Sequence, residues 1–188
     1  MKDVLQASIR DHIELMQKVQ ETLLDRVLEI GRLLFEPLTQ GNKILVAGNG
    51  GSAADAQHFT AELVGRYMKE RRSLPAIALT TDTSALTAIG NDYGFEHVFR
   101  RQLEGLGCAG DVFLAISTSG NSQNLIEAME QAKSMKIATI ALVGKSGGKM
   151  LEIADHGLLV PSDCTPRIQE AQQWIWHTWC EIIDELAV

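Results

Sequence analysis

The chain reads Lys43-Ile44-Leu45-Val46-Ala47-Gly48-Asn49-Gly50-Gly51-Ser52 where an apolar run meets a glycine-rich turn. A second stretch has the same order: Asp111-Val112-Phe113-Leu114-Ala115-Ile116 runs into Ser117-Thr118-Ser119-Gly120-Asn121-Ser122. Each apolar run predicts a buried strand, and helical sequence follows each turn. Such turns present free backbone N–H groups at the positive end of a helix dipole, and serine hydroxyls add neutral donors. The two loops therefore predict a phosphorylated ligand held between them.

Five strand-like segments alternate with helical ones along the chain. The strands are expected at Lys43–Ala47, Ala76–Leu79, Val112–Ile116, Ala138–Val143 and His156–Val160. The helices are expected near Ala53–Met68, Ser84–Ile89, Glu96–Leu106, Gln123–Met135, Lys149–Ile153 and Pro166–Leu186. Apolar strands separated by helices indicate an α/β three-layer sandwich, with a five-stranded parallel sheet covered on both faces. The ligand should then lie at the carboxyl ends of the strands, where both loops fall.

Residues 1–41 form a long amphipathic segment ahead of the first strand. Apolar residues recur there at intervals of three and four, while Gly31 and Pro37 interrupt the pattern. We expect either one helix with a break or two consecutive helices, which pack on their own domain or on another subunit. Because the sequence contains no linker or internal repeat, residues 1–188 are expected to form a single domain.

Composition excludes several classes of protein. The formal net charge of −7 argues against a nucleic-acid-binding face, which would be basic. Cys108, Cys164 and Cys180 are odd in number and widely spaced, so they are expected to be free thiols in a reducing compartment. The N-terminus has no signal-peptide core, and no apolar run reaches the ~20 residues of a membrane span. A cytoplasmic location is therefore expected.

Two pairs of residues are candidates for metal binding or proton transfer. His58 and Glu62 are four apart on one predicted helix, which puts their side chains on one face, roughly 6 Å apart. By spacing alone, a solvated surface pair is the commoner arrangement. Gln169 and His177 are eight apart on the last helix, about 12 Å along its axis. They can share one metal only if they lean together, and one from each of two subunits is an equal possibility.

Two further motifs have simpler interpretations. Asn91-Asp92 lies in the cluster Gly90-Asn91-Asp92-Tyr93-Gly94, which is typical of a turn and could also bind a polyhydroxylated ligand. Gly48-Asn49-Gly50-Gly51-Ser52-Ala53 fits a loose dinucleotide fingerprint. Asp82, the candidate ribose acid, lies well beyond the usual ~20-residue spacing. A dehydrogenase is accordingly a weak alternative.

Taken together, these residues resemble the sugar isomerase (SIS) domain family over essentially the whole chain. The resemblance is carried by residues 47–58, 79–84, 88–94 and 117–122 and by Arg167-Ile168-Gln169-Glu170. It implies a flavodoxin-like SIS fold with one zinc per subunit, bound by His58, Glu62, Gln169 and His177. It also implies substrate contacts from Asn49, Gly50, Gly51, Ser52, Glu62, Asn91, Asp92, Ser117, Thr118, Ser119, Ser122 and Gln169.

The resemblance further implies a cytoplasmic homotetramer with active sites at subunit interfaces and no nucleic-acid or membrane partner. The implied reaction converts sedoheptulose 7-phosphate into D-glycero-D-manno-heptose 7-phosphate through an enediol(ate), on the way to lipopolysaccharide heptose. We expect Glu62 to shuttle the carbon-bound proton and His177 to handle oxygen protons or ring opening. A glutamate that also binds zinc is a weaker base, so the metal could move, exchange or leave during turnover.

Two alternatives within this family remain. Some relatives are non-catalytic modules that associate with a bacterial replication initiator, but they lack the carboxylate and the final histidine, and this chain has Glu62 and His177. An isomerase of another phosphosugar is the second alternative. The chain departs from the family at Gln172, where relatives often carry histidine, and this could alter hydrogen bonds that orient the metal ligands.

Overall fold

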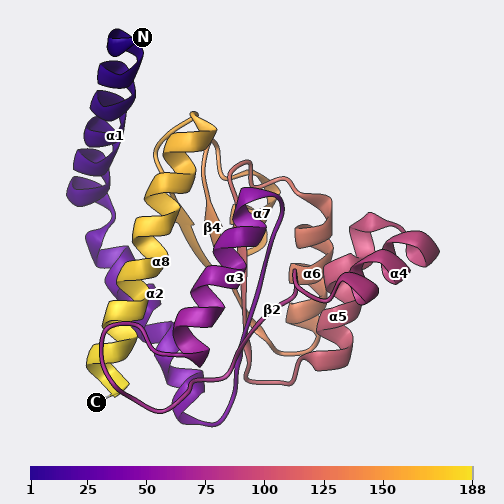
Figure 1. Cartoon of the computed structure of the whole chain (residues 1–188). Coiled ribbons are helices and arrows are strands. Elements are labelled where there is room, and N and C mark those ends of the chain that lie inside the picture. Colours follow the sequence, from indigo (N-terminus) through magenta and orange to yellow (C-terminus); the bar gives the residue numbers. More distant parts are fainter. Residues whose placement is uncertain (188) are drawn as a thin grey trace.

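The computed structural model describes residues 1–187 and joins five parallel strands into one sheet of order β2-β1-β3-β4-β5 (Figure 1). The strands are β1 Ile44–Gly48, β2 Ala76–Ala78, β3 Val112–Ser117, β4 Ala138–Val143 and β5 His156–Leu159. Since β1 and β3 are neighbours, with Gly48 paired to Ile116, the two loops that follow these strands begin side by side. The parallel five-stranded sheet predicted from the sequence is confirmed.

Helices cover both faces of the sheet. They are α1 Lys2–Thr22, α2 Leu24–Thr39, α3 Gly51–Val64, α4 Thr83–Tyr93, α5 Val98–Leu106, α6 Gln123–Ser134, α7 Gly148–Ile153 and α8 Thr165–Ala187, with a short 3₁₀ turn η1 at Phe95–His97. Alternate strand residues point to opposite faces, so Ile44 and Val46 pack with α2, α3 and α8 while Leu45 and Ala47 pack with α5, α6 and α7. The sheet is therefore buried on both sides, as its unbroken apolar strands require.

The N-terminal segment forms two helices that meet at Leu23, and neither Gly31 nor Pro37 breaks α2. Gly31 has a packing role instead: a Cβ there would lie 2.7 Å from the Ile182 side chain, so only glycine lets α2 approach α8 this closely. Pro37 falls in the last turn of α2, where a lost backbone N–H costs little. The two-helix prediction is confirmed, but the interruption predicted at these residues is wrong.

Two further boundaries differ from expectation. Helix α3 ends at Val64 rather than near Met68, because the chain turns at Gly65 into an irregular loop. Helix α4 extends to Tyr93, so Asn91 and Asp92 lie in its last turn rather than in a free turn. The Asp82 side chain caps α4 by accepting the Ala85 N–H at 2.9 Å, which accounts for this residue without a ribose. None of the helices within residues 1–187 is long and apolar enough to cross a membrane.

Candidate active site

The first loop is a tight glycine turn at the entry to α3. Gly50 adopts a φ of 56°, which favours glycine. The Ser52 N–H donates to the Asn49 carbonyl at 3.0 Å, and a Cβ on Gly48 would lie 2.4 Å from the Ser52 carbonyl oxygen. Gly50, the N-cap of α3, has no side chain to accept its first N–H groups. Most of the first N–H groups of α3 already donate to the Asn49 and Gly50 carbonyls, so among the described residues the Gly51 N–H is the donor left to face an anion.

The second loop brings three serine hydroxyls together. Ser117 Oγ lies 3.2 Å from Ser122 Oγ and 3.5 Å from Ser119 Oγ, and the Gly120 N–H donates to Ser117 Oγ at 3.2 Å. Ser122 is the N-cap of α6, yet its side chain makes no capping hydrogen bond. The hydroxyls and the start of α6 thus form a neutral set of donors suited to phosphate oxygens.

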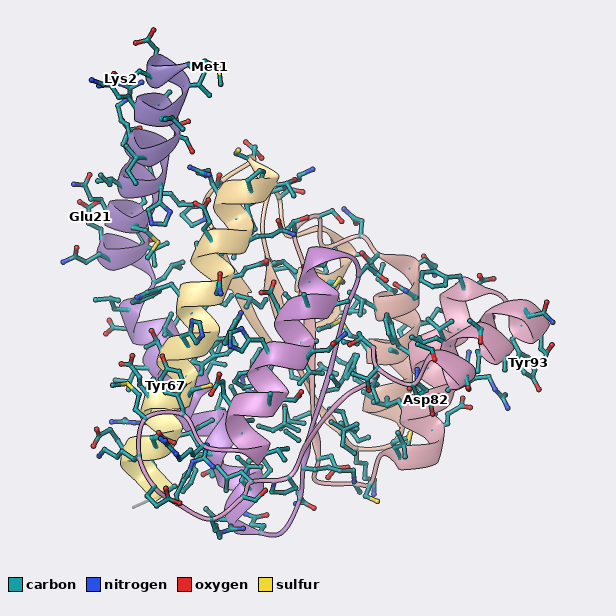
Figure 2. All side chains as sticks on the ribbon, in the orientation of Figure 1. Met1, Lys2, Glu21, Tyr67, Asp82 and Tyr93 are labelled. Carbon is teal, nitrogen blue, oxygen red and sulfur yellow. The ribbon has the colours of Figure 1, made fainter. Side chains whose placement is uncertain are left out.

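Three of the four predicted metal ligands gather where α3 and α8 run side by side (Figure 1). His58 Nε2 and Glu62 Oε1 are 3.0 Å apart, and the His58 and His177 ring centroids are 5.3 Å apart. Tyr67, labelled in Figure 2, stacks on His177 with ring centroids 5.6 Å apart. Imidazole and carboxylate are the donors that zinc prefers, so the residue types suit this metal. Within residues 1–187, however, no three His, Cys, Asp or Glu side chains are already in position to hold an ion.

The surroundings of the cluster favour the neutral form of the His177 imidazole. Burial lowers the pKa of His177, the charge of His58 lowers it further, and Glu62 and Glu181 oppose the shift. Burial raises the pKa of Asp55, one turn before His58, although Trp176 and His58 act in the opposite direction. At neutral pH the His177 imidazole can therefore both accept and donate a proton.

Gln169 occupies a different part of the α3–α8 interface. Its Nε2 would lie 2.4 Å from a Cβ on Gly51, so the side chain rests against the first loop. His58 is seven residues further along α3, about 10 Å, and Glu62 eleven residues, about 16 Å. The structure thus brings His58, Glu62 and His177 together and places the Gln169 side chain beside Gly51.

Asn91 and Asp92 lie away from both loops. Asn91 Nδ2 donates to the Asp92 carboxylate at 2.8 Å, and both residues are exposed. Helix α4 packs on α5 and η1, and its Tyr93 end points away from α3 and α8 (Figures 1 and 2). A ligand seated on the two loops would therefore meet these residues only if another subunit supplied them.

Several residues near the site were missed at the level of sequence. Tyr67, over His177, follows α3 in an irregular loop and carries no local signal. Arg71 donates from Nη2 to the Glu62 carbonyl at 2.8 Å and from Nη1 to the Leu63 carbonyl at 2.9 Å. Asn124 donates to and accepts from Asn49 and is buried in the structure. Its only signal in the sequence is weak: it is a polar residue directly before the apolar pair Leu125-Ile126. These side chains support the loops and the end of α3.

Comparisons with known proteins identify the family of this chain. The SIS domain family model matches residues 9–144. Phosphoheptose isomerase 1 of Campylobacter jejuni is 55% identical over 185 residues, covering 98% of this chain and 99% of the relative. The enzyme of Sulfurimonas denitrificans is 53% identical, covering 98% and 96%. The solved phosphoheptose isomerase GmhA of Neisseria gonorrhoeae superposes with a TM-score of 0.93 at 46% identity, covering 98% of each chain.

Fold and site thus define a phosphosugar-binding protein of the SIS type, and the chain belongs to the SIS domain family. Within that family it belongs to the phosphoheptose isomerases, which are aldose–ketose isomerases. The family predicted from the sequence is confirmed.

Proposed function

We propose that this chain interconverts sedoheptulose 7-phosphate and D-glycero-D-manno-heptose 7-phosphate, an early step of ADP-heptose synthesis for lipopolysaccharide. The observation that carries the proposal is helix α3, which bears the hydrogen-bonded pair His58–Glu62 and begins at the glycine loop, directly beside the serine loop that would hold the phosphate. An anchor and an acid–base pair are the two elements that a phosphosugar isomerase needs. The phosphoheptose isomerases that are about half identical over nearly the full length support the choice of substrate.

The phosphate is assigned to the second loop. The Ser117 hydroxyl lies within 3.5 Å of the Ser119 and Ser122 hydroxyls, and Thr118 follows Ser117 in the same loop. Asn49, Gly50, Gly51, Ser52 and Gln169 are assigned to the sugar from the neighbouring loop, and Asn91 and Asp92 to the sugar from another subunit. Binding energy from the phosphate then orients carbons that lie several bonds away.

Proton transfer is assigned to Glu62 and His177. In the direction from ketose to aldose, Glu62 takes a proton from C1 to form the enediolate and returns it to C2. His177, held neutral by burial, moves the proton between the oxygens on C1 and C2. Atoms balance, because one proton moves from C1 to C2 and another moves from the C1 oxygen to the C2 oxygen, with no external reactant.

Zinc, one per subunit, is proposed at His58, Glu62, Gln169 and His177. Two imidazoles and a carboxylate already lie close together, and Gln169 would complete the set from this chain or from a neighbour. When bound, zinc would polarise the carbonyl and hydroxyl oxygens of the sugar. The residues of the chain alone supply the proton path described above.

A homotetramer in the cytoplasm is proposed as the working form. Helix α1 exposes the apolar side chains Val4, Leu5, Ile9 and Ile13 along its length, and each is at least half exposed. A second subunit would cover this surface and could bring Asn91-Asp92 to the loops. The exposed, free thiols of Cys108 and Cys164 fit a reducing compartment.

The test is incubation of the purified chain with sedoheptulose 7-phosphate, followed by NMR detection of the aldose, with and without chelator and with zinc added back. Turnover that chelation abolishes and zinc restores is the expected result. Turnover that does not change upon chelation would support the isomerase activity and contradict the proposed metal site. No turnover of this sugar in any metal condition would contradict the proposal, and a panel of other phosphosugars and binding to a replication initiator would then be measured.

A further inference from the structure

A pair of asparagine side chains bridges the two loops. Asn49 Nδ2 donates to Asn124 Oδ1 at 2.9 Å, and Asn124 Nδ2 donates to Asn49 Oδ1 at 2.9 Å. Both amides therefore use one donor and one acceptor on each other, like a base pair. The two residues are 75 positions apart in the chain, so only the fold brings them together.

The sheet explains why the bridge falls at this point. Gly48 and Ile116 are paired across β1 and β3, so Asn49 and Ser117 are the first residues past the same edge of the sheet. Asn124 follows the second loop, in the first turn of α6, and is only 4% exposed. Asn49 is half-buried, so part of its side chain is still accessible. The bridge thus spans the gap in which the phosphosugar is expected.

The bridge also fixes the direction of the Asn49 amide. A lone asparagine on a glycine-rich turn could rotate its side chain and exchange its donor and acceptor. With one N–H and one lone pair committed to Asn124, the remaining N–H and lone pair of Asn49 face a single direction. Asn124 is too buried to serve a ligand in the same way, so its influence must pass through Asn49 and through the spacing of the loops.

We propose that Asn124 is a positioning residue of this isomerase, which aims Asn49 at the sugar part of the substrate and holds the glycine loop at a set distance from the serine loop. This inference rests on the proposed function, because Asn49 is one of the proposed substrate contacts. Preorganisation of this kind favours binding, so its loss should appear mainly in KM.

The test is a double-mutant cycle on kcat and KM for sedoheptulose 7-phosphate with Asn49→Ala, Asn124→Ala and the double variant. Asn124→Ala should raise KM about tenfold, the order expected when two hydrogen bonds are lost. The same substitution in the Asn49→Ala background should have almost no further effect. Asn124→Leu keeps the volume of the side chain and should reproduce the Asn124→Ala result, which separates the hydrogen bonds from packing.

Thr139→Val is the matched structural control. Thr139 is fully buried, and its hydroxyl donates to the Asp155 carboxylate at 2.7 Å near the opposite ends of the strands. This variant should lower Tm and leave KM unchanged. If Asn124→Ala lowers Tm but leaves KM unchanged, or raises KM equally in both backgrounds, the positioning role is wrong.

Hydrogen exchange of the Asn49 side-chain amide, followed by ¹⁵N NMR, tests the bridge without turnover. Slow exchange in the wild-type chain and fast exchange in Asn124→Leu are expected. Fast exchange in both the wild-type chain and Asn124→Leu would overturn the inference and would leave the proposed isomerase activity unaffected. If the wild-type chain fails to isomerise the sugar, the proposed function falls, and this readout still decides whether the bridge exists.

Discussion

At the scale of single residues, the site pairs a carboxylate with an imidazole on one face of α3. The 3.0 Å contact between His58 and Glu62 follows from their spacing of four residues on α3, and the 23% exposed Glu62 side chain can still reach a ligand. The neighbouring His177 is held neutral chiefly by burial. The proposed acid–base function therefore rests on a few atoms, and small substitutions should affect turnover far more than folding.

Glu62→Gln should reduce kcat by about 10²- to 10⁴-fold, because the amide cannot accept the carbon-bound proton. Its Tm should stay near the wild-type value, since the amide keeps the shape of the side chain. Steady-state kinetics and thermal unfolding measure the two quantities. Glu181→Gln, the same chemical change on an exposed carboxylate one turn beyond His177, is the control and should retain activity. Near-normal turnover of Glu62→Gln would remove this residue from the mechanism.

Ser122→Ala should raise KM by about tenfold or more and change kcat little, because a hydrogen bond to a charged phosphate is lost at a distance from the reacting carbons. Ser134→Ala, at the other end of α6, removes a hydroxyl that bonds only to the Gln131 carbonyl and serves as the control. Equal KM values in the two variants would place the phosphate elsewhere.

At the scale of elements, the end of α3 is anchored to α8 by a buried ion pair. Arg71 Nε lies 2.7 Å from Asp184 Oδ1, and the two side chains are 1% and 2% exposed. Arg71 also donates to the carbonyls of Glu62 and Leu63, which have no partner within the helix. Burial by itself would raise the pKa of Asp184, but the Lys69 N–H, Arg71 and the Met68 N–H outweigh it, so the pKa lies below the usual value.

Asp184→Asn should lower the free energy of unfolding at pH 7 by about 3–5 kcal/mol, because Arg71 is left buried without its partner. Since the folded-state pKa of Asp184 is depressed, its stabilisation is present above the unfolded pKa of about 3.9 and is lost as pH falls through the folded pKa. The variant should therefore lose less stability than wild type upon acidification. Urea unfolding at several pH values measures this difference.

Glu185→Gln is the matched control for that prediction. Glu185 pairs with Lys69, but the two side chains are 70% and 39% exposed, so the substitution should cost at most about 1 kcal/mol. If the two variants were equally stable at pH 7, the buried pair would not anchor α3.

At the scale of the whole molecule, α1 extends beyond the body of the fold and presents an apolar surface (Figure 1). It is held to α8 by polar contacts, including His12 Nδ1 with Glu170 Oε2 at 2.7 Å and Arg167 with the Ser8 carbonyl. Ile9 and Ile13 remain 58% and 50% exposed on its free side. A face of this kind is expected to pack against other copies of the chain.

Replacing both Ile9 and Ile13 with glutamate should dissociate the assembly, because charges at an apolar interface lose their hydration. Light scattering coupled to size exclusion measures the mass. Turnover should fall along with the mass if a neighbouring subunit supplies Asn91 and Asp92. Lys18→Glu, at an exposed position of the same helix on another face from Ile9 and Ile13, should leave the mass unchanged. A wild-type chain that is already monomeric would contradict the proposed tetramer.

The sequence by itself determined those features that depend on neighbours along the chain. Strand runs, the two loops and the His58–Glu62 pair follow from local periodicity and spacing, and the structure agrees with them. Even local reasoning failed where a distant contact intervened: Gly31 lies inside α2 because α8 packs against it. The turn predicted at Asn91-Asp92 was likewise wrong, because α4, capped at its start by Asp82, continues through both residues.

Only the tertiary structure decided how distant residues combine. It paired Asn49 with Asn124, set Gln169 against Gly51, and placed Tyr67 over His177. The physical reason is that these contacts depend on the order of strands in the sheet and on which helices share a face. Strand order joins β1 to β3 across 60-odd intervening residues, and no local pattern encodes that pairing.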